Sequence, residues 1–137
     1  AGRGEQRYWV SPTMVAPLTT RHRVGEEDLT LGHMVDFGLG FILDSNRYGV
    51  DTVPYGYGRW CSPRTFGHGG AQCAHGFCDP EYGLVVAWAF NGRPGEGQHQ
   101  RRAKALNEAI YLDLGIAKTQ AGQGPVARYD PRLWFRG

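Results

Sequence analysis

The chain lacks any long hydrophobic run and any strong excess of one charge. No apolar stretch reaches the roughly 18 residues that a membrane helix needs, and the start from Ala1 to Glu5 lacks the apolar core of a signal peptide. Fifteen basic residues against thirteen acidic ones leave a formal net charge of +2, and the basic residues are scattered. We therefore expect a soluble chain with no membrane and no nucleic acid as partner, although a segment upstream of it could carry a targeting signal.

Cysteine is also scarce. Cys61, Cys73 and Cys78 cannot all pair within one chain, so we expect reduced thiols, which favours the cytoplasm without fixing the location. Cys73, His75 and Cys78 are of the types that bind zinc, but Cys78 would point to the other side of a strand and no second ligand pair follows. Buried thiols are the better interpretation, and we expect no metal and no cofactor.

Glycine, by contrast, is abundant, with 21 residues in the chain. Most of them fall where strands and turns are expected, which indicates turns and close backbone approach rather than disorder. The length predicts one domain, over residues 1–120, followed by an extended tail over residues 121–137.

Local patterns predict a short helix, four strands and a longer helix. Ser11 can cap a helix and Pro12 suits its first turn, so residues 11–20 are expected to form a short helix that ends at Pro17. Residues 21–32 are charged and unpatterned, which predicts a loop. Strands are expected over residues 36–44, 66–71, 74–78 and 84–90, with an irregular aromatic segment over residues 48–60.

The last helix is expected over residues 100–114, with Gly115 at its end. Its apolar positions at helical spacing are Ala103, Leu106, Ile110 and Leu114. The turn over residues 79–83 predicts antiparallel pairing of its two flanking strands. The fold class is therefore α+β, an antiparallel sheet with a packed C-terminal helix.

The strand over residues 84–90 is apolar at nearly every position, so both of its faces should be covered. One good helix and one short helix supply too little material for two covering layers. We expect the missing layer to belong to another polypeptide or to a lost portion of this one.

The most informative motif runs from Phe66 to Ala71, with the sequence Phe-Gly-His-Gly-Gly-Ala. It places the imidazole of His68 and side-chain-free backbone at a sheet edge, where a ligand can approach closely. Asp79-Pro80-Glu81 and an apolar strand ending at Asn91 follow at short spacing.

Together with the earlier Gly38-Leu39-Gly40 segment and the closing helix, this order and spacing resemble the C-terminal part of the β-lactamase-like serine hydrolases. That family includes class C β-lactamases, D-alanyl-D-alanine carboxypeptidases and related esterases. The likeness runs from about Ser11 to Gly115. It implies an α/β sandwich whose N-terminal portion is missing from this chain, and hydrolysis through a serine acyl-enzyme.

The resemblance implies roles for the residues of the motif. His68 would orient or electrostatically assist the substrate, and the N–H of Ala71 would be an oxyanion-hole donor. Gly69 and Gly70 would keep the strand clear for substrate. Gln72 stands where relatives often have a small residue, so it would also border the substrate.

Two tyrosines of the irregular segment leave two interpretations open. Tyr55 and Tyr57, with Trp60, either form a wall of a substrate pocket or pack under a long loop. The aromatic residues between Arg128 and Arg136 are expected to dock against a partner polypeptide.

The family's Ser-x-x-Lys motif, which holds the nucleophile and its activating lysine, is absent from the sequence. The third residue after each serine, Ser11, Ser45 and Ser62, is Met14, Tyr48 and Thr65 respectively. A Tyr-x-Asn motif is absent too. We therefore expect the catalytic serine on an N-terminal hydrolase polypeptide, and a small ester, amide or β-lactam as substrate. The alternative is a non-catalytic binding or scaffold protein that keeps the fold.

Overall fold

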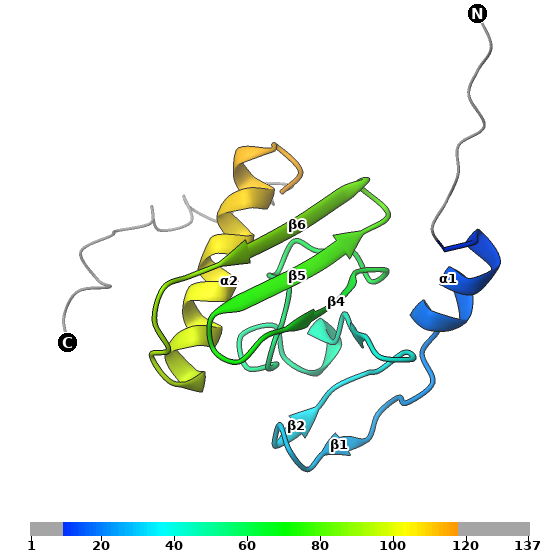
Figure 1. Cartoon of the computed structure of the whole chain (residues 1–137), viewed down its shortest axis with the longest axis horizontal. Helices are drawn as coiled ribbons and strands as arrows, with labels where there is room; N and C mark the ends of the chain where they lie inside the picture. The colour runs from blue at the N-terminus through cyan, green and yellow to red at the C-terminus, as the bar shows by residue number, and fades with distance from the viewer. Residues whose placement is uncertain (1–9, 118–137) are drawn as a thin grey trace, which may run out of the picture.

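The computed structural model of the chain describes residues 10–117, so the expected tail over residues 121–137 and its docking lie outside the described part. The fold is α+β (Figure 1). The elements in chain order are α1 (Pro12–Thr19), β1 (Glu27–Asp28), β2 (His33–Met34), β3 (Ile42–Leu43), the 3-10 helix η1 (Asn46–Tyr48), β4 (Phe66–Gly69), β5 (Ala74–Asp79), β6 (Leu84–Ala89) and α2 (Glu96–Asp113). Among the described residues, no helix is long and apolar enough to cross a membrane.

The main sheet has four antiparallel strands in the order β3-β4-β5-β6, and β1 pairs with β2 in a separate hairpin. His68 lies opposite Gly76, which in turn lies opposite Ala87. Directly opposed residues share a face of the sheet, and neighbours along a strand alternate between faces. His68, Gly76 and Ala87 therefore lie on one face, and Gly69 and His75 lie on the other.

Two turns produce this meander. Gly83 has a φ of 61°, which a glycine adopts without steric cost, and the N–H of Tyr82 donates to the carbonyl of Asp79 at 3.3 Å. The predicted turn between β5 and β6 is thus confirmed. The turn between β4 and β5 is closed by a 2.8 Å hydrogen bond from the N–H of Gly70 to the carbonyl of Ala74.

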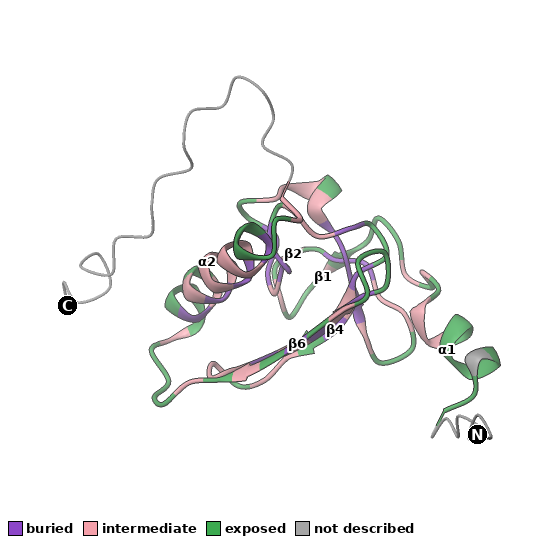
Figure 2. Ribbon diagram, turned by 90° about the horizontal axis from the view of Figure 1, so that it is seen from above, coloured by how far each residue is buried: buried purple, intermediate pink, exposed green. Residues whose placement is uncertain are grey.

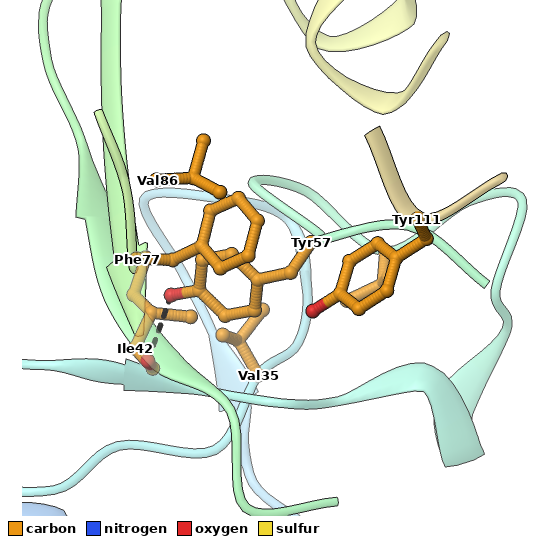
Figure 3. Packing of buried hydrophobic residues seen from close by; sticks show 7 residues of the cluster. Val35, Ile42, Tyr57, Phe77, Val86 and Tyr111 are labelled. Carbon is orange, nitrogen blue, oxygen red and sulfur yellow. Dashed lines mark hydrogen bonds between the residues drawn. The ribbon is translucent and has the colours of Figure 1, made fainter. Parts of the chain in front are cut away.

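Helix α2 covers one face of the sheet (Figure 2). The rings of Phe77 on β5 and Tyr111 on α2 are stacked with centroids 6.2 Å apart. Figure 3 shows the core between the helix and the sheet, where the hydroxyl of Tyr57 donates a 2.8 Å hydrogen bond to the carbonyl of Ile42. We call this side the covered face.

The opposite side, which we call the open face, is not covered by any helix in the described part of the chain (Figure 2). On β6, Val85 is 75% exposed, and Ala87 and Ala89 are also exposed. The expectation that β6 is covered on both faces is therefore not met by the described residues alone. Apart from His68, this face carries small or apolar side chains.

The helices differ from their expected form in two ways. Pro17 lies inside α1 and does not end it, because the proline removes a single N–H and the bond from Thr20 N–H to the carbonyl of Ala16 still closes the last turn. The buried positions of α2 are His99, Ala103, Asn107 and Tyr111. Leu114, expected in the buried stripe, is 56% exposed. Gly115 follows α2 with a φ of 67°, as its predicted place at the helix end requires.

The predicted strand over residues 36–44 is wrong for most of its length. Gly40 has a φ of 84°, and the N–H of Gly38 donates to the carbonyl of Phe41, so the chain reverses inside that segment. Only β3 remains as a strand. The predicted loop over residues 21–32 also contains β1, which pairs with β2.

Candidate functional site

His68 is exposed on the open face of β4, and its ring is oriented by the backbone of the next residue, Gly69. Its Nδ1 lies 2.6 Å from the carbonyl oxygen of Gly69. A carbonyl oxygen only accepts hydrogen bonds, so Nδ1 carries the proton in this contact. In the neutral ring Nε2 is then the acceptor, available to a substrate or to a donor from another polypeptide.

The backbone beyond His68 is free along one edge. Strand β3 pairs only with Phe66 and Gly67, which leaves the following residues of β4 without a neighbouring strand on that side among the described residues. The N–H of Ala71 donates to no acceptor within residues 10–117. Ala71 as a residue is exposed. An unused backbone N–H is the type of group that can bind an anionic oxygen.

A shallow hollow of about 530 Å³ lies beside His68 on the open face. Its lining residues are His68, Gly69, Gly70, Ala74, His75, Gly76, Ala87, Trp88 and Ala89. The register explains its floor, because Gly76 and the small side chains of Ala74, Ala87 and Ala89 lie on this same face. Glycine and alanine leave room for another segment or a ligand to approach the sheet closely.

The two glycines of the motif have different surroundings. A Cβ on Gly69 would lie 2.3 Å from Cδ1 of Tyr55, so the tyrosine ring occupies that space on the covered side. A Cβ on Gly70 would have Ala74 Cβ as its nearest neighbour, at 3.3 Å. Both glycines line the hollow, and Gly69 is in addition fixed by packing against Tyr55.

Tyr55 and Tyr57 lie away from the hollow. Tyr57 is 1% exposed, and its ring stacks on His75 with centroids 5.2 Å apart. A side chain without access to solvent cannot line a substrate pocket, so the packing interpretation replaces the pocket-wall interpretation for Tyr57. The ring of Tyr55 packs against Gly69 from the covered side, and its hydroxyl donates to Glu96 at 2.9 Å. Burial and this hydrogen bond raise the pKa of Tyr55 to about 12.

Gln72 lies at the tip of the turn after Ala71, with a φ of 60°. Its side-chain oxygen accepts a 3.1 Å hydrogen bond from the N–H of Gly95, and its carbonyl accepts a 2.7 Å bond from Arg102. The side-chain oxygen of Gln72 is therefore engaged with Gly95, at the start of α2.

A buried polar chain lies beneath the site, and the sequence patterns did not reveal it. The indole N–H of Trp88 donates to Oδ1 of Asn107 at 3.0 Å, and Nδ2 of Asn107 lies 3.3 Å from Nδ1 of His75. Because Nδ2 of Asn107 is a donor, Nδ1 of His75 accepts this hydrogen bond. Burial, with smaller effects from His99 and His68, lowers the pKa of His75 to about 4.

The three cysteines are free thiols, as expected. Cys61 donates to the buried carboxylate of Asp44 at 3.3 Å, and burial raises the pKa of the Cys61 thiol. His75 faces the core while Cys78 lies on the open face, so the two do not converge. In the part of the chain that the structure describes, no three His, Cys, Asp or Glu side chains gather in a way that could hold a metal ion.

Comparisons with known proteins agree with the order of the motifs. No curated protein matches the chain in sequence. The sequence model of the Beta-lactamase family matches residues 9–110, which include the motif from Phe66 to Ala71, the whole of the main sheet and most of α2. The antiparallel sheet with one helical layer fits part of the α/β sandwich of that family. The chain therefore belongs to the beta-lactamase family.

Proposed function

We propose that this chain is one part of a serine hydrolase, and that it supplies His68 and the N–H of Ala71 to an active site whose nucleophile lies on another polypeptide. The observation that carries the proposal is the free edge of β4. There the imidazole of His68, with an available Nε2, lines a hollow with an apolar floor, and the unused N–H of Ala71 follows three residues later in the chain. The substrate class is a small ester, amide or β-lactam.

The proposed reaction is acyl transfer to water. The partner's serine oxygen bonds to the substrate carbonyl carbon, and the bond from that carbon to the ester oxygen or amide nitrogen breaks, which gives an acyl-enzyme. The proton of the serine passes to the released oxygen or nitrogen, which in a β-lactam stays attached to the acyl group. Water then releases the acid and restores the serine. The N–H of Ala71 would stabilise the oxyanion formed in each step, a contact worth roughly 3–4 kcal/mol in the transition state.

His68 would assist through Nε2. In the tautomer set by the Gly69 carbonyl, this nitrogen can accept a hydrogen bond from a polar group of the substrate or of the nucleophile-bearing polypeptide. This role needs no covalent chemistry on the ring. It requires only that the imidazole keep its orientation at the edge of β4.

The open face supports the need for a partner. Val85, Ala87 and Ala89 present apolar surface next to the hollow, and an α/β sandwich buries both faces of its sheet. The absence of Ser-x-x-Lys from the sequence points the same way. We propose that the nucleophile-bearing polypeptide covers this face and so brings its serine to the edge of β4.

The first experiment asks whether such a partner exists. The chain is purified from its source under gentle conditions, and co-purifying chains are identified by intact mass. We expect one that contains Ser-x-x-Lys and is labelled by a fluorophosphonate or penicillin probe. A monomeric species of 15.2 kDa alone, without labelling, would contradict the proposal.

The second experiment tests His68 in the assembled protein. His68→Ala should lower the rate of hydrolysis of a p-nitrophenyl ester by roughly a hundredfold, within the range for a group that assists in the transition state. Its free energy of unfolding should be unchanged. His22→Ala is a matched control. That exposed histidine lies in the connection after α1, outside the site, and its ring bonds to the carbonyl of Pro17. Equal turnover of the two variants would remove His68 from the mechanism.

The second candidate function is a non-catalytic binding protein, favoured by the absence of the nucleophile from the chain itself. The probe experiment distinguishes the two. Only a competent serine is covalently labelled, whereas a binding protein would retain a partner or ligand without labelling.

A further inference from the structure

The two strained residues of the described chain border the same short segment. Within residues 10–117, Tyr55 with a φ of 52° and Gln72 with a φ of 60° are the non-glycine residues with a positive φ. Residues other than glycine adopt this conformation at a cost and keep it only where the surrounding structure holds them. Tyr55 contacts Gly69, and Gln72 follows Ala71.

We propose that Tyr55 and Gln72 are positioning residues, which fix the backbone from Gly69 to Ala71 and thereby orient the His68 ring and the Ala71 N–H. This inference rests on the proposed function for its catalytic consequence. The claim that Tyr55 and Gln72 fix this backbone does not depend on that function. It assigns to Tyr55 and Gln72 a role behind the site instead of contact with substrate.

Tyr55 acts on the Gly69 side of the segment. Its ring fills the space where a side chain of residue 69 would project, with Cδ1 and Cε1 at 2.3 and 2.5 Å from that Cβ position. Its hydroxyl is held by Glu96, at the first turn of α2. The ring thus supports Gly69, whose carbonyl accepts the hydrogen bond from His68 Nδ1. A shift of Tyr55 would therefore free the imidazole to rotate.

Gln72 acts on the Ala71 side. Arg102 donates to its carbonyl, and the same guanidinium group lies over the Phe90 ring with its carbon 4.4 Å from the centroid. Gly95 donates to its side chain at 3.1 Å. Both contacts connect the turn to the start of α2, so that helix and the two strained residues form one frame around the free edge.

A tyrosine or glutamine chosen for substrate contact would have its polar end free. Here the Tyr55 hydroxyl donates to Glu96, and the side-chain oxygen of Gln72 accepts from the N–H of Gly95. We therefore assign the positive φ of both residues to holding the backbone from Gly69 to Ala71. Substitution by glycine would relieve the strain and would remove the Tyr55 ring or the Gln72 side-chain bond to Gly95. A variant can therefore be as stable as the natural chain and still position this segment less well.

The first test follows the His68 tautomer by long-range ¹H–¹⁵N NMR in the full chain. We expect the Nδ1–H form at neutral pH in the natural protein and in Tyr55→Phe, which keeps the ring. Tyr55→Gly should show a mixture of both tautomers. A natural protein without tautomer preference, or a folded Tyr55→Gly that keeps it, would overturn the role of Tyr55.

The second test follows Ala71 by ¹⁵N relaxation, and it decides the proposal alone if Tyr55→Gly does not fold. The order parameter of Ala71 should be near the rigid value of about 0.85 in the natural protein and below about 0.6 in Gln72→Gly. The urea midpoint of Gln72→Gly should be equal or higher, because the strain is gone. An unchanged order parameter would overturn the role of Gln72.

Kinetics of the assembled protein connect the frame to the proposed function. Gln72→Gly should lower kcat for a p-nitrophenyl ester by roughly tenfold to a hundredfold, with KM within about twofold. A change confined to KM would indicate substrate contact and contradict the positioning role. If the assembled natural protein does not hydrolyse the ester, the proposed function fails, while the NMR tests still decide whether the frame exists.

Discussion

The phenol of Tyr111 donates a 2.8 Å hydrogen bond to Oδ2 of Asp79 and so joins α2 to the end of β5. Ser62 donates to the same carboxylate through its N–H at 2.8 Å and its hydroxyl at 2.6 Å. Burial alone would raise the pKa of Asp79, but the hydrogen bonds from Ser62 and Tyr111 outweigh it and the pKa is lowered. One buried carboxylate thus connects the sheet, the helix and the loop before β4.

Asp79→Asn should destabilise the chain without changing the shape of the side chain much. The asparagine side chain has no charge, and its amino group would face the donors of Ser62 and Tyr111. We therefore expect the free energy of unfolding to fall by roughly 3 kcal/mol. Urea denaturation measures the change. Asp113→Asn, at an exposed carboxylate on α2, should stay within about 0.5 kcal/mol of the natural chain. Similar losses in both variants would contradict the importance of the network.

Stability should depend on pH through His75. Its pKa falls from 6.5 to about 4 on folding, so the unfolded chain binds more protons between these values and the folded chain loses stability as the pH falls through them. The expected loss from this residue is about 3 kcal/mol, since each unit of pKa corresponds to about 1.4 kcal/mol.

The difference between two pH profiles isolates this effect. His75→Gln removes the titration, and the remaining groups contribute equally to both proteins. The free energy of unfolding of the natural chain should fall more steeply between pH 6.5 and pH 4 than that of His75→Gln. Parallel profiles would show that His75 is not held neutral in the folded chain.

Gly69 and Gly76 should respond differently to alanine, although both lie in the central strands. A Cβ on Gly69 would collide with the Tyr55 ring, so Gly69→Ala should cost about 1–3 kcal/mol. A Cβ on Gly76 would lie on the open face, 3.8 Å from the carbonyl oxygen of Val86, so Gly76→Ala should be neutral or slightly stabilising. Thermal unfolding of both variants checks the contrast, and equal losses would contradict the placement of Tyr55.

The open face gives a prediction about assembly. Ala87→Glu places a charge on exposed surface, so the chain alone should keep its stability. If the nucleophile-bearing polypeptide covers this face, the buried charge should weaken its binding by roughly thirtyfold or more. Gln98→Glu, on an exposed position of α2, changes the net charge by the same amount and is the matched control. Unchanged binding of Ala87→Glu would place the partner elsewhere.

The sequence alone predicted the elements that depend on local signals. The glycine-flanked segment from Phe66, the apolar run from Leu84 and the turn at Gly83 indicate β4, β5 and β6, and Gly115 marks the end of α2, because these features act over a few neighbouring residues. The motif around His68 led to the family for the same reason. Its order and spacing are properties of the chain, and the match over residues 9–110 agrees with them.

The tertiary structure decided which side chains meet. Nothing near Gly69 in the sequence shows that Tyr55 fills its missing side chain, and no helical pattern predicts polar Asn107 in the buried face of α2. Asn107 is tolerated there because Trp88 and His75 satisfy its amide. Such pairings join residues far apart in the chain, and only packing in three dimensions selects them.

The sequence by itself therefore determined the family, the three long strands and the absence of the Ser-x-x-Lys nucleophile from this chain. Only the tertiary structure decided that His68 lies exposed on the open face with its ring held by the Gly69 carbonyl, that the hollow beside it has a floor of small residues, and that Tyr55 packs against Gly69 from the covered side. The physical reason is that local conformation follows from neighbouring residues, whereas strand register and the packing of α2 depend on contacts between distant ones.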